Sequence, residues 1–263
     1  MNLTAILTAA AFIGGVGLII GILLTIAGKV FYVKVDEKVV AVRNCLPGNN
    51  CGGCGFPGCD GLAEAIAKGE APVDGCPVGG SPVAGAISDI MGVAAPSGER
   101  MVAFVKCSGT CDKTSFQYHY YGNMDCWQML VATGSGEKGC QYGCMGYGSC
   151  VAVCPFDAIR IQNGRAAVDP DKCKACGKCL NNCPRHLIEL VPVSAQYRVR
   201  CSSHDKGKAV KAVCRAGCIG CGLCAKNCEQ SAITLTDNLA YINQELCIGC
   251  GKCAEKCPVK IIG

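Results

Sequence analysis

Four cysteines stand within eleven residues of the stretch GCIGCGLCAKNC, at residues 217–228. Neighbouring cysteines in so tight a loop seldom meet the geometry that a disulfide demands. Zinc sites usually combine two close cysteines with a distant pair. The spacing C-x2-C-x2-C-x3-C is instead typical of iron–sulfur ligation, in which three thiolates hold one [4Fe–4S] cluster and the fourth holds another. We therefore interpret the run as an iron–sulfur motif, with zinc as the main alternative.

A second run of the same spacing completes the ligand sets. Residues 247–258 read CIGCGKCAEKCP. In bacterial two-cluster ferredoxins the last cysteine of each run ligates the cluster of the other run. This crossover rule assigns one cluster to Cys218, Cys221, Cys224 and Cys257, and the other to Cys228, Cys247, Cys250 and Cys253.

The chain contains an earlier copy of the same unit. A shift of 74 positions, which carries Cys140 onto Cys214 and Cys183 onto Cys257, superposes eight cysteines without a gap. Self-similarity at a fixed period indicates an internal repeat. The crossover rule gives this first copy one regular set, Cys154, Cys173, Cys176 and Cys179.

The other set of the first copy is irregular, because Tyr147 stands where the second copy has Cys221. Cys144, Cys150 and Cys183 remain, and Cys140 is our candidate for the fourth ligand. A three-iron cluster, or a ligand borrowed from elsewhere in the chain, are the alternatives.

The remaining cysteines suggest a further cluster. Cys107, Cys111 and Cys126 precede the first copy, and VRCSS at Cys201 echoes VKCSG at Cys107. We expect a sixth cluster held by Cys107, Cys111, Cys126 and one of Cys140, Cys201 or Cys214. The chain then carries five or six [4Fe–4S] clusters. Six would use 24 of the 26 cysteines and leave Cys45, which we interpret as an ordinary small residue, and one other.

A different cysteine pattern lies nearer the N-terminus. Cys51, Cys54, Cys59 and Cys76 give C-x2-C-x4-C-x16-C, with glycines that let the backbone wrap closely around a cluster. GLAEAIAKG between the third and fourth cysteines predicts a short helix that ends at Gly69. Residues 81–98 resemble a linker with one weakly helical stretch.

The first 28 residues carry no charge and predict a membrane anchor. A helix of about 25 residues is about 38 Å long, enough to cross a hydrocarbon core of about 30 Å. A cleaved signal peptide would need a basic start and a shorter apolar stretch. Lys29, Lys34, Lys38 and Arg43 follow the span and place its C-terminal side in the cytoplasm. Thiolates that bind iron also need a reducing compartment.

These features predict an α+β chain in four parts. They are an anchor at 1–30, a 4Fe-4S module with its linker at 31–95, a Cys-rich segment with the first ferredoxin unit at 96–200, and the second unit at 201–263. Asn163-Gly164 and Asp237-Asn238 predict a hairpin turn in each copy. Because only 17% of residues are charged and 6% aromatic, we expect the clusters to hold the small lobes together.

The combination resembles one known family. The anchor, the N-terminal module and ferredoxin pairs containing CVAVCPFDAI and CKACGKCLNNCP are similar to the B subunit of the Rnf electron-transport complex. The second copy and KCSGTCDKTSFQYHYYGNMDC resemble its longer form. The resemblance implies a membrane complex that oxidises ferredoxin, passes electrons to NAD or to a membrane or haem carrier, and pumps Na⁺ or H⁺. It places flavin and nicotinamide sites on other subunits.

The residues themselves favour one-electron transfer. The sequence shows no nucleophile–base pair, phosphate loop or dinucleotide fingerprint, so we assign this chain no catalytic residue. A formal net charge of +5 without a basic run gives no reason to expect nucleic acid. We expect soluble ferredoxin as the electron donor and membrane subunits as partners. The alternatives are a membrane-tethered polyferredoxin of a hydrogenase or other oxidoreductase, and a non-redox scaffold or sensor.

Overall fold

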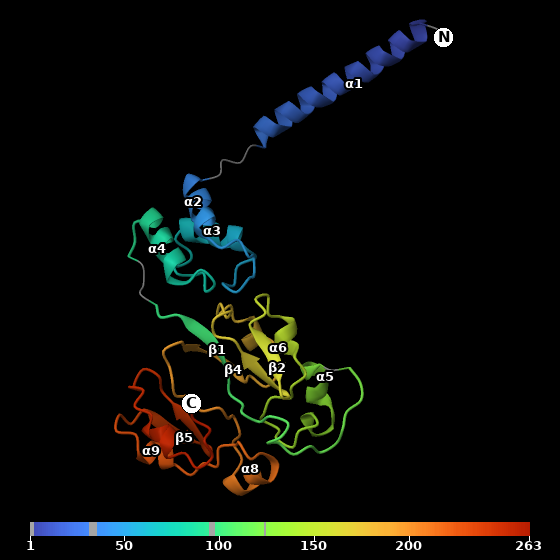
Figure 1. Ribbon diagram of the computed structural model, residues 1–263. Coiled ribbons are helices and arrows are strands. Elements are labelled where there is room, and N and C mark those ends of the chain that lie inside the picture. The colour runs from blue at the N-terminus through green and yellow to red at the C-terminus, as the bar shows by residue number, and fades with distance from the viewer. Residues whose placement is uncertain (1–2, 32–35, 95–97, 124) are drawn as a thin grey trace.

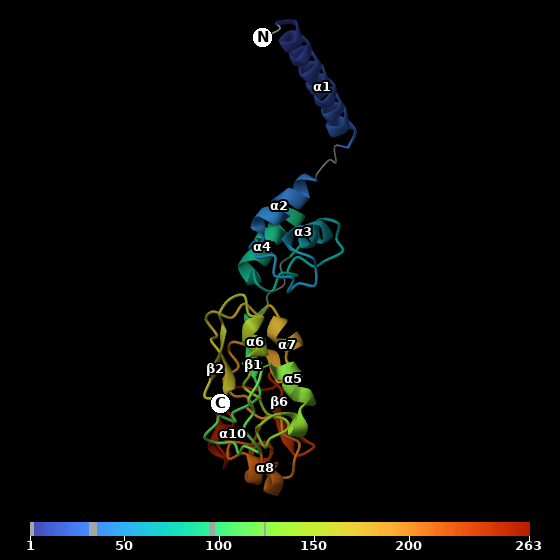
Figure 2. The same ribbon diagram turned by 90° about the vertical axis from the view of Figure 1, so that its right-hand side faces the viewer.

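The computed structural model describes residues 3–31, 36–94, 98–123 and 125–263. Figures 1 and 2 show an elongated arrangement with α1 at one end. A small helical module comes next, followed by the two ferredoxin copies, and the C-terminus lies in the lobe far from α1. The fold class is α+β, as predicted.

Helix α1, Leu3–Val30, is the predicted anchor. Its segment Ala11–Val30 has a mean hydropathy of 2.3, and none of it is buried against the rest of the chain. By length and composition α1 can therefore cross a membrane. Of the basic residues that follow it in the sequence, Lys34 lies outside the described residues.

Three helices build the module that follows the anchor: α2 (Glu37–Cys45), α3 (Cys59–Ala67) and α4 (Gly80–Met91). Their core contains Val42, Leu62, Ile66 and Ile87, which are all at most 1% exposed. The helix predicted from GLAEAIAKG is confirmed as α3, and it ends before Gly69, whose φ of 76° closes the helix.

Helix α4 differs from the linker that the sequence suggested. Ala84, Ile87 and Ser88 are buried, and α4 packs against α2. These positions lie one helical turn apart and form a short apolar face. The segment is therefore an integral wall of the module.

Each ferredoxin copy contains the predicted hairpin. In the first, β2 (Ile159–Gln162) pairs with β3 (Arg165–Val168), and in the second, β5 (Ile233–Thr236) pairs with β6 (Leu239–Ile242). Both central turn residues have positive φ in each hairpin, which is the geometry of a type I′ turn. Four short helices each carry the cysteine at the third ligand position of a run: α6 (Ser149–Ala152), α7 (Lys178–Asn181), α9 (Leu223–Lys226) and α10 (Lys252–Glu255).

One strand pair was not anticipated from the sequence. β1 (Met101–Val105) pairs antiparallel with β4 (Ile188–Pro192), so the segment before the first copy joins the segment after it. The remaining elements are α5 (Cys126–Val131), the 3-10 turn Thr133–Ser135 and α8 (Gly207–Val213). A bridge between Thr114 and Cys214 then connects the Cys-rich segment to the second copy.

The buried position of α4 gives a test of the module. We expect Ile87→Ala to destabilise it by about 2–5 kcal/mol, because the change leaves a cavity among fully packed helices. Val93→Ala, at a side chain that is 53% exposed, is the control and should change stability by no more than about 0.5 kcal/mol. Denaturant midpoints of the anaerobically purified chain measure both, and equal midpoints would mean that the segment is only a linker.

Candidate iron–sulfur sites

Three cavities are lined by cysteine thiols. One is lined by Cys218, Cys221, Cys224 and Cys257 (site 5). Another is lined by Cys228, Cys247, Cys250 and Cys253 (site 6). These are the two sets that the crossover rule assigns to the second copy. The third cavity lies between the two copies and is described below as site 4.

The regular set of the first copy also comes together. Burial, and then the neighbouring thiolates of Cys173, Cys176 and Cys154, raise the pKa of Cys179 to about 12. These four thiols are site 2. The structure thus brings together every cysteine that the crossover rule assigns to one cluster here.

The N-terminal module gathers its own thiols. Burial raises the pKa of Cys76, and the thiolates of Cys59 and Cys54 add to the shift. The amide of Gly79 donates to the Cys76 sulfur at 3.4 Å. Cys51 lies on the same loop as Cys54. We name Cys51, Cys54, Cys59 and Cys76 site 1. Cys45 is the last residue of α2 and packs against the same core as Cys54, Cys59 and Cys76.

Tyr147 is not placed to replace the missing cysteine of the first copy. Its hydroxyl donates to Glu137 at 3.0 Å. Burial, and then this hydrogen bond to Glu137, raise the pKa of Tyr147, so the phenol stays protonated. The fourth thiol must therefore come from another segment.

Cys126 occupies that place. Burial raises the pKa of Cys150 to about 12, and the thiolates of Cys144, Cys126 and Cys183 all lie close enough to raise it. The Cys126 amide donates to the Ser149 hydroxyl at 2.9 Å, which ties the start of α5 to the residue before Cys150. We name Cys126, Cys144, Cys150 and Cys183 site 3.

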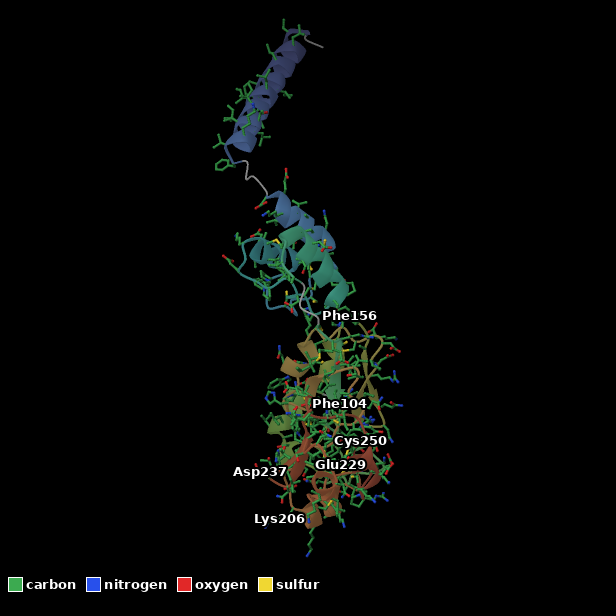
Figure 3. The ribbon with its side chains drawn as sticks, turned by 90° about the vertical axis from the view of Figure 1, so that its left-hand side faces the viewer. Phe104, Phe156, Lys206, Glu229, Asp237 and Cys250 are labelled. Carbon is green, nitrogen blue, oxygen red and sulfur yellow. The ribbon has the colours of Figure 1, made fainter. Side chains whose placement is uncertain are left out.

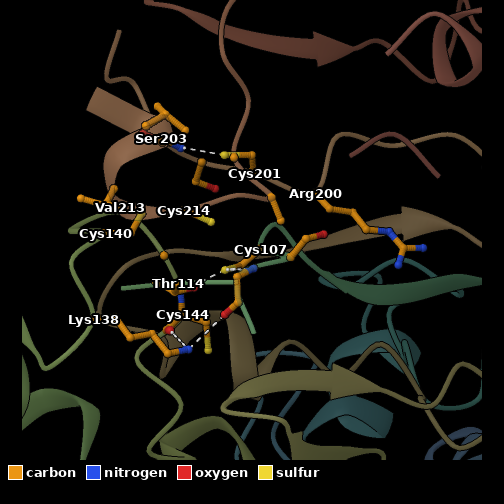
Figure 4. A pocket seen from close by; sticks show the side chains of 17 residues that line it. Cys107, Thr114, Lys138, Cys140, Cys144, Arg200, Cys201, Ser203, Val213 and Cys214 are labelled. Carbon is orange, nitrogen blue, oxygen red and sulfur yellow. Dashed lines mark hydrogen bonds between the residues drawn. The ribbon is translucent and has the colours of Figure 1, made fainter. Parts of the chain in front are cut away.

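Cys140, our candidate for this position, lies in a different site. Burial raises the pKa of Cys140, and its thiolate neighbours are Cys107 and Cys214. These three and Cys201 line the third cavity, which is site 4 (Figure 4). Cys111, which we expected in the sixth set, lies instead against Gly164 in the hairpin turn of the first copy.

Long-range backbone contacts explain why site 4 could not be assigned from spacing. Ser115 accepts from Gly139 at 2.8 Å and donates to Val213 at 2.9 Å, which places Cys140 and Cys214 beside the same segment. The Ser202 hydroxyl donates to the Lys106 carbonyl at 3.1 Å and so brings Cys201 near Cys107. The similarity between VKCSG around Cys107 and VRCSS around Cys201 is the sequence feature that indicates this pairing.

Site 4 has the symmetry of the repeat. Cys140 and Cys214 are equivalent under the shift of 74 positions. Cys107 accepts from the amide of Cys144 at 3.2 Å, and Cys201 accepts from that of Cys218 at 3.3 Å. Cys144 and Cys218 are the first cysteines of equivalent runs. Each copy therefore contributes one thiol to site 4, the segment before each copy contributes another, and the amide-to-sulfur bonds match on the two sides.

The donor groups fit [4Fe–4S] clusters better than single metal ions. Among the described residues, no three His, Cys, Asp or Glu side chains converge tightly enough to hold one ion. A tetrahedral zinc ion with Zn–S bonds of about 2.3 Å would require that. The thiols instead stand around cavities, and amides donate to sulfurs, as at Cys76, Cys107 and Cys201. Such hydrogen bonds help to set cluster potentials.

The six sites form a continuous series of neighbours. Gly53 of site 1 lies against Cys176 of site 2. Cys179 of site 2 lies near Cys150 of site 3. The amide-to-sulfur bonds described above then join site 3 to site 4 and site 4 to site 5. Sites 5 and 6 share the hydrophobic core of the second copy.

The thiol at the irregular site gives a direct prediction. We expect Cys126→Ala to convert or empty site 3, with a loss of about one to four iron atoms per chain, because only three thiols remain. Cys111→Ala is the matched control and should retain all iron. Iron analysis and electron paramagnetic resonance (EPR) of both variants measure this loss. Iron loss in Cys111→Ala but not in Cys126→Ala would show that Cys111 is the ligand.

Comparisons with known proteins agree with this arrangement. Residues 46–78 match the family described as "Putative Fe-S cluster", and residues 136–185 and 217–261 each match a 4Fe-4S dicluster domain. The three matches cover the N-terminal module and the two ferredoxin copies.

Three relatives that match along most of the chain are B subunits of ion-translocating complexes. That of the Na(+)-translocating ferredoxin:NAD(+) oxidoreductase complex of Acetobacterium woodii is 49% identical over 92% of this chain and 73% of its own length. The B subunit of the ion-translocating oxidoreductase complex of Methanosarcina acetivorans is 42% identical over 92% of this chain and 92% of its own length. The B subunit of the proton-translocating ferredoxin:NAD(+) oxidoreductase complex of Clostridium ljungdahlii is 41% identical over 88% of this chain and 82% of its own length. This chain therefore belongs to the family of iron–sulfur B subunits of ion-translocating oxidoreductase (Rnf) complexes.

Proposed function

We propose that this chain accepts electrons from reduced ferredoxin at its second ferredoxin copy and carries them through six [4Fe–4S] clusters to membrane partners. The observation that carries this proposal is the unbroken order of the six thiol sites, each in contact with the next. When bound, the clusters supply one-electron redox chemistry. The chain's own residues hold them, space them and exclude water.

The second copy is the best entry point for electrons. Cys221 of site 5 and Cys250 of site 6 are exposed, whereas the other cysteines are buried or partly buried. Figure 3 shows Cys250 and Glu229 in the lobe far from α1. Glu229 forms an ion pair with Lys252 beside site 6, which joins its two cysteine runs. A soluble donor can therefore approach these sites without displacing other parts of the chain.

The N-terminal module is the best exit. Phe156 marks the end of the first copy that faces this module in Figure 3. Site 1 is the site nearest in sequence to α1, so a membrane subunit can meet it there. Lys29 in the last turn of α1, and Lys38 and Arg43 after it, support a cytoplasmic position for all six sites.

The acceptor and the coupling ion are proposed from the relatives. The names of two of them specify ferredoxin and NAD(+), one with Na(+) and one as proton-translocating. We propose that other subunits reduce NAD, or a membrane or haem carrier, and move Na⁺ or H⁺. This chain supplies them with electrons only.

The donor can be tested with the full chain purified anaerobically in detergent. Reduced ferredoxin, mixed rapidly with the oxidised chain, should bleach its visible absorbance and produce EPR signals of reduced clusters. The same chain stripped of iron is the control. Clusters that dithionite reduces but reduced ferredoxin does not would contradict the proposed donor. Clusters that neither reduces would favour the scaffold or sensor alternative.

The contact between sites 1 and 2 gives a second test. A Cβ atom on Gly53 would lie 2.7 Å from the Cys176 carbonyl oxygen, so a side chain must push the module away from the first copy. We expect Gly53→Val to slow reduction of site 1 at least tenfold while sites 2–6 are reduced at the usual rate. Gly85→Ala in α4, where a Cβ meets nothing within 4 Å, should leave the rate unchanged. Freeze-quench EPR follows each step, and an unchanged rate in Gly53→Val would refute this route.

A further inference from the structure

A buried lysine lies at the junction of sites 3 and 4. Lys138 is 6% exposed, and among the described residues it is the one charged side chain that is buried to this extent. Its ammonium donates to the carbonyl of Gly109 at 3.1 Å, to that of Cys144 at 3.0 Å, and to that of Gly164. Figure 4 shows the side chain next to Cys144.

A partly buried arginine lies at the same junction. The guanidinium of Arg185 donates to the Cys140 carbonyl at 3.2 Å and to the carbonyls of Gly143 and Ser135. Its Nε atom is buried without a hydrogen-bond partner. The thiols closest to Arg185 electrostatically belong to both sites, namely Cys140 and Cys107 of site 4 and Cys144 and Cys126 of site 3.

Within the described part of the chain, neither cation forms an ion pair with a carboxylate. The ion pairs among the described residues involve Arg43, Lys68, Lys106 and Lys252, and do not include Lys138 or Arg185. Both use neutral carbonyls as hydrogen-bond acceptors. A buried charge without a counter-charge is strongly destabilising. The anionic ligands of sites 3 and 4 are therefore the counter-charge.

The second copy has no equivalent pair. The shift of 74 positions carries Lys138 onto Ala212 and Arg185 onto Val259. Val259 lines the cavity of site 5. Arg200 lines site 4, but its Nε donates to the Gly263 carbonyl at 2.7 Å, and its guanidinium extends away from the four sulfurs in Figure 4. Lys138 and Arg185 therefore place positive charge on the first-copy side of site 4, and the equivalent positions of the second copy carry none.

The amide-to-sulfur bonds do not create the same difference. Cys107 accepts from Gly109, and Cys201 accepts from Ser203, both at 3.4 Å. The bond from the Cys144 amide to Cys107 and the bond from the Cys218 amide to Cys201 match as well. Hydrogen bonds to sulfur therefore affect the two sides of site 4 alike, and the difference in fixed charge remains.

We propose that Lys138 and Arg185 raise the reduction potentials of sites 3 and 4 above those of sites 5 and 6, and so draw electrons from the second copy into the first. Reduction adds one electron and no proton to a cluster held by four thiolates, which makes the site more negative by one charge. A cation fixed beside it in a medium of low dielectric stabilises the reduced form. The inference rests on the proposed ligand sets and direction of transfer.

An EPR-monitored redox titration of the full chain in detergent tests this. Lys138→Met and Arg185→Gln each remove a charge at similar side-chain length. Each should lower the equilibrium constant for reduction of one or two clusters at least tenfold, a shift of about 59 mV or more to negative potential for a one-electron couple. The signals of sites 5 and 6 should not move.

Three further variants separate charge from packing. Lys138→Arg and Arg185→Lys keep the charge, and their potentials should stay close to those of the unmodified chain. Lys211→Met removes an exposed lysine of α8 and should change no potential. Iron and sulfide analysis accompanies every titration.

Several results would overturn the proposal. Neutral variants with full iron content and unshifted potentials would do so, as would equal shifts in all clusters. If both neutral variants lose iron, these cations serve assembly and the proposal fails as stated. A deficit of iron at sites 3 and 4 in the unmodified chain would instead refute the ligand sets on which the proposed function rests.

Discussion

The bond between cysteine thiolate and iron is the interaction on which the fold of this chain depends. Outside α1 and the α2–α4 module, the regular elements are two hairpins, one further strand pair and helices of at most 7 residues, which are too short to be stable alone. The buried residues of each ferredoxin copy include the cysteines themselves, such as Cys150 and Cys179 in the first. Because the ligands are also core residues, cluster binding and folding are one process.

Duplication explains the central position of site 4. Two copies of a two-cluster unit account for sites 2, 3, 5 and 6, and the segments before each copy bring Cys107 and Cys201 between them. Each copy then adds one further thiol, Cys140 or Cys214. Site 4 therefore connects two ferredoxin units whose clusters would otherwise be separate. The symmetry of this junction leaves direction undetermined, and the fixed charges of Lys138 and Arg185 supply it.

The sequence predicts features that are encoded locally. The hairpin turns follow from Asn163-Gly164 and Asp237-Asn238, because both pairs tolerate positive φ. The crossover sets follow from the regular spacing of paired runs. In contrast, the position of Cys126 depends on the contact between α5 and Ser149, and that of Cys140 depends on the bridge from Thr114 to Cys214. Burial of Lys138 is also a tertiary property, since lysine is normally exposed.

The account is tested most directly by iron, acid-labile sulfide and zinc analysis of the anaerobically purified full chain. Six clusters predict about 24 iron and about 24 sulfide atoms per chain, with no stoichiometric zinc. About 20 of each would leave one of the six thiol sites without its cluster. Zinc in place of iron and sulfide would contradict the central claim, because the chain could then carry no electrons.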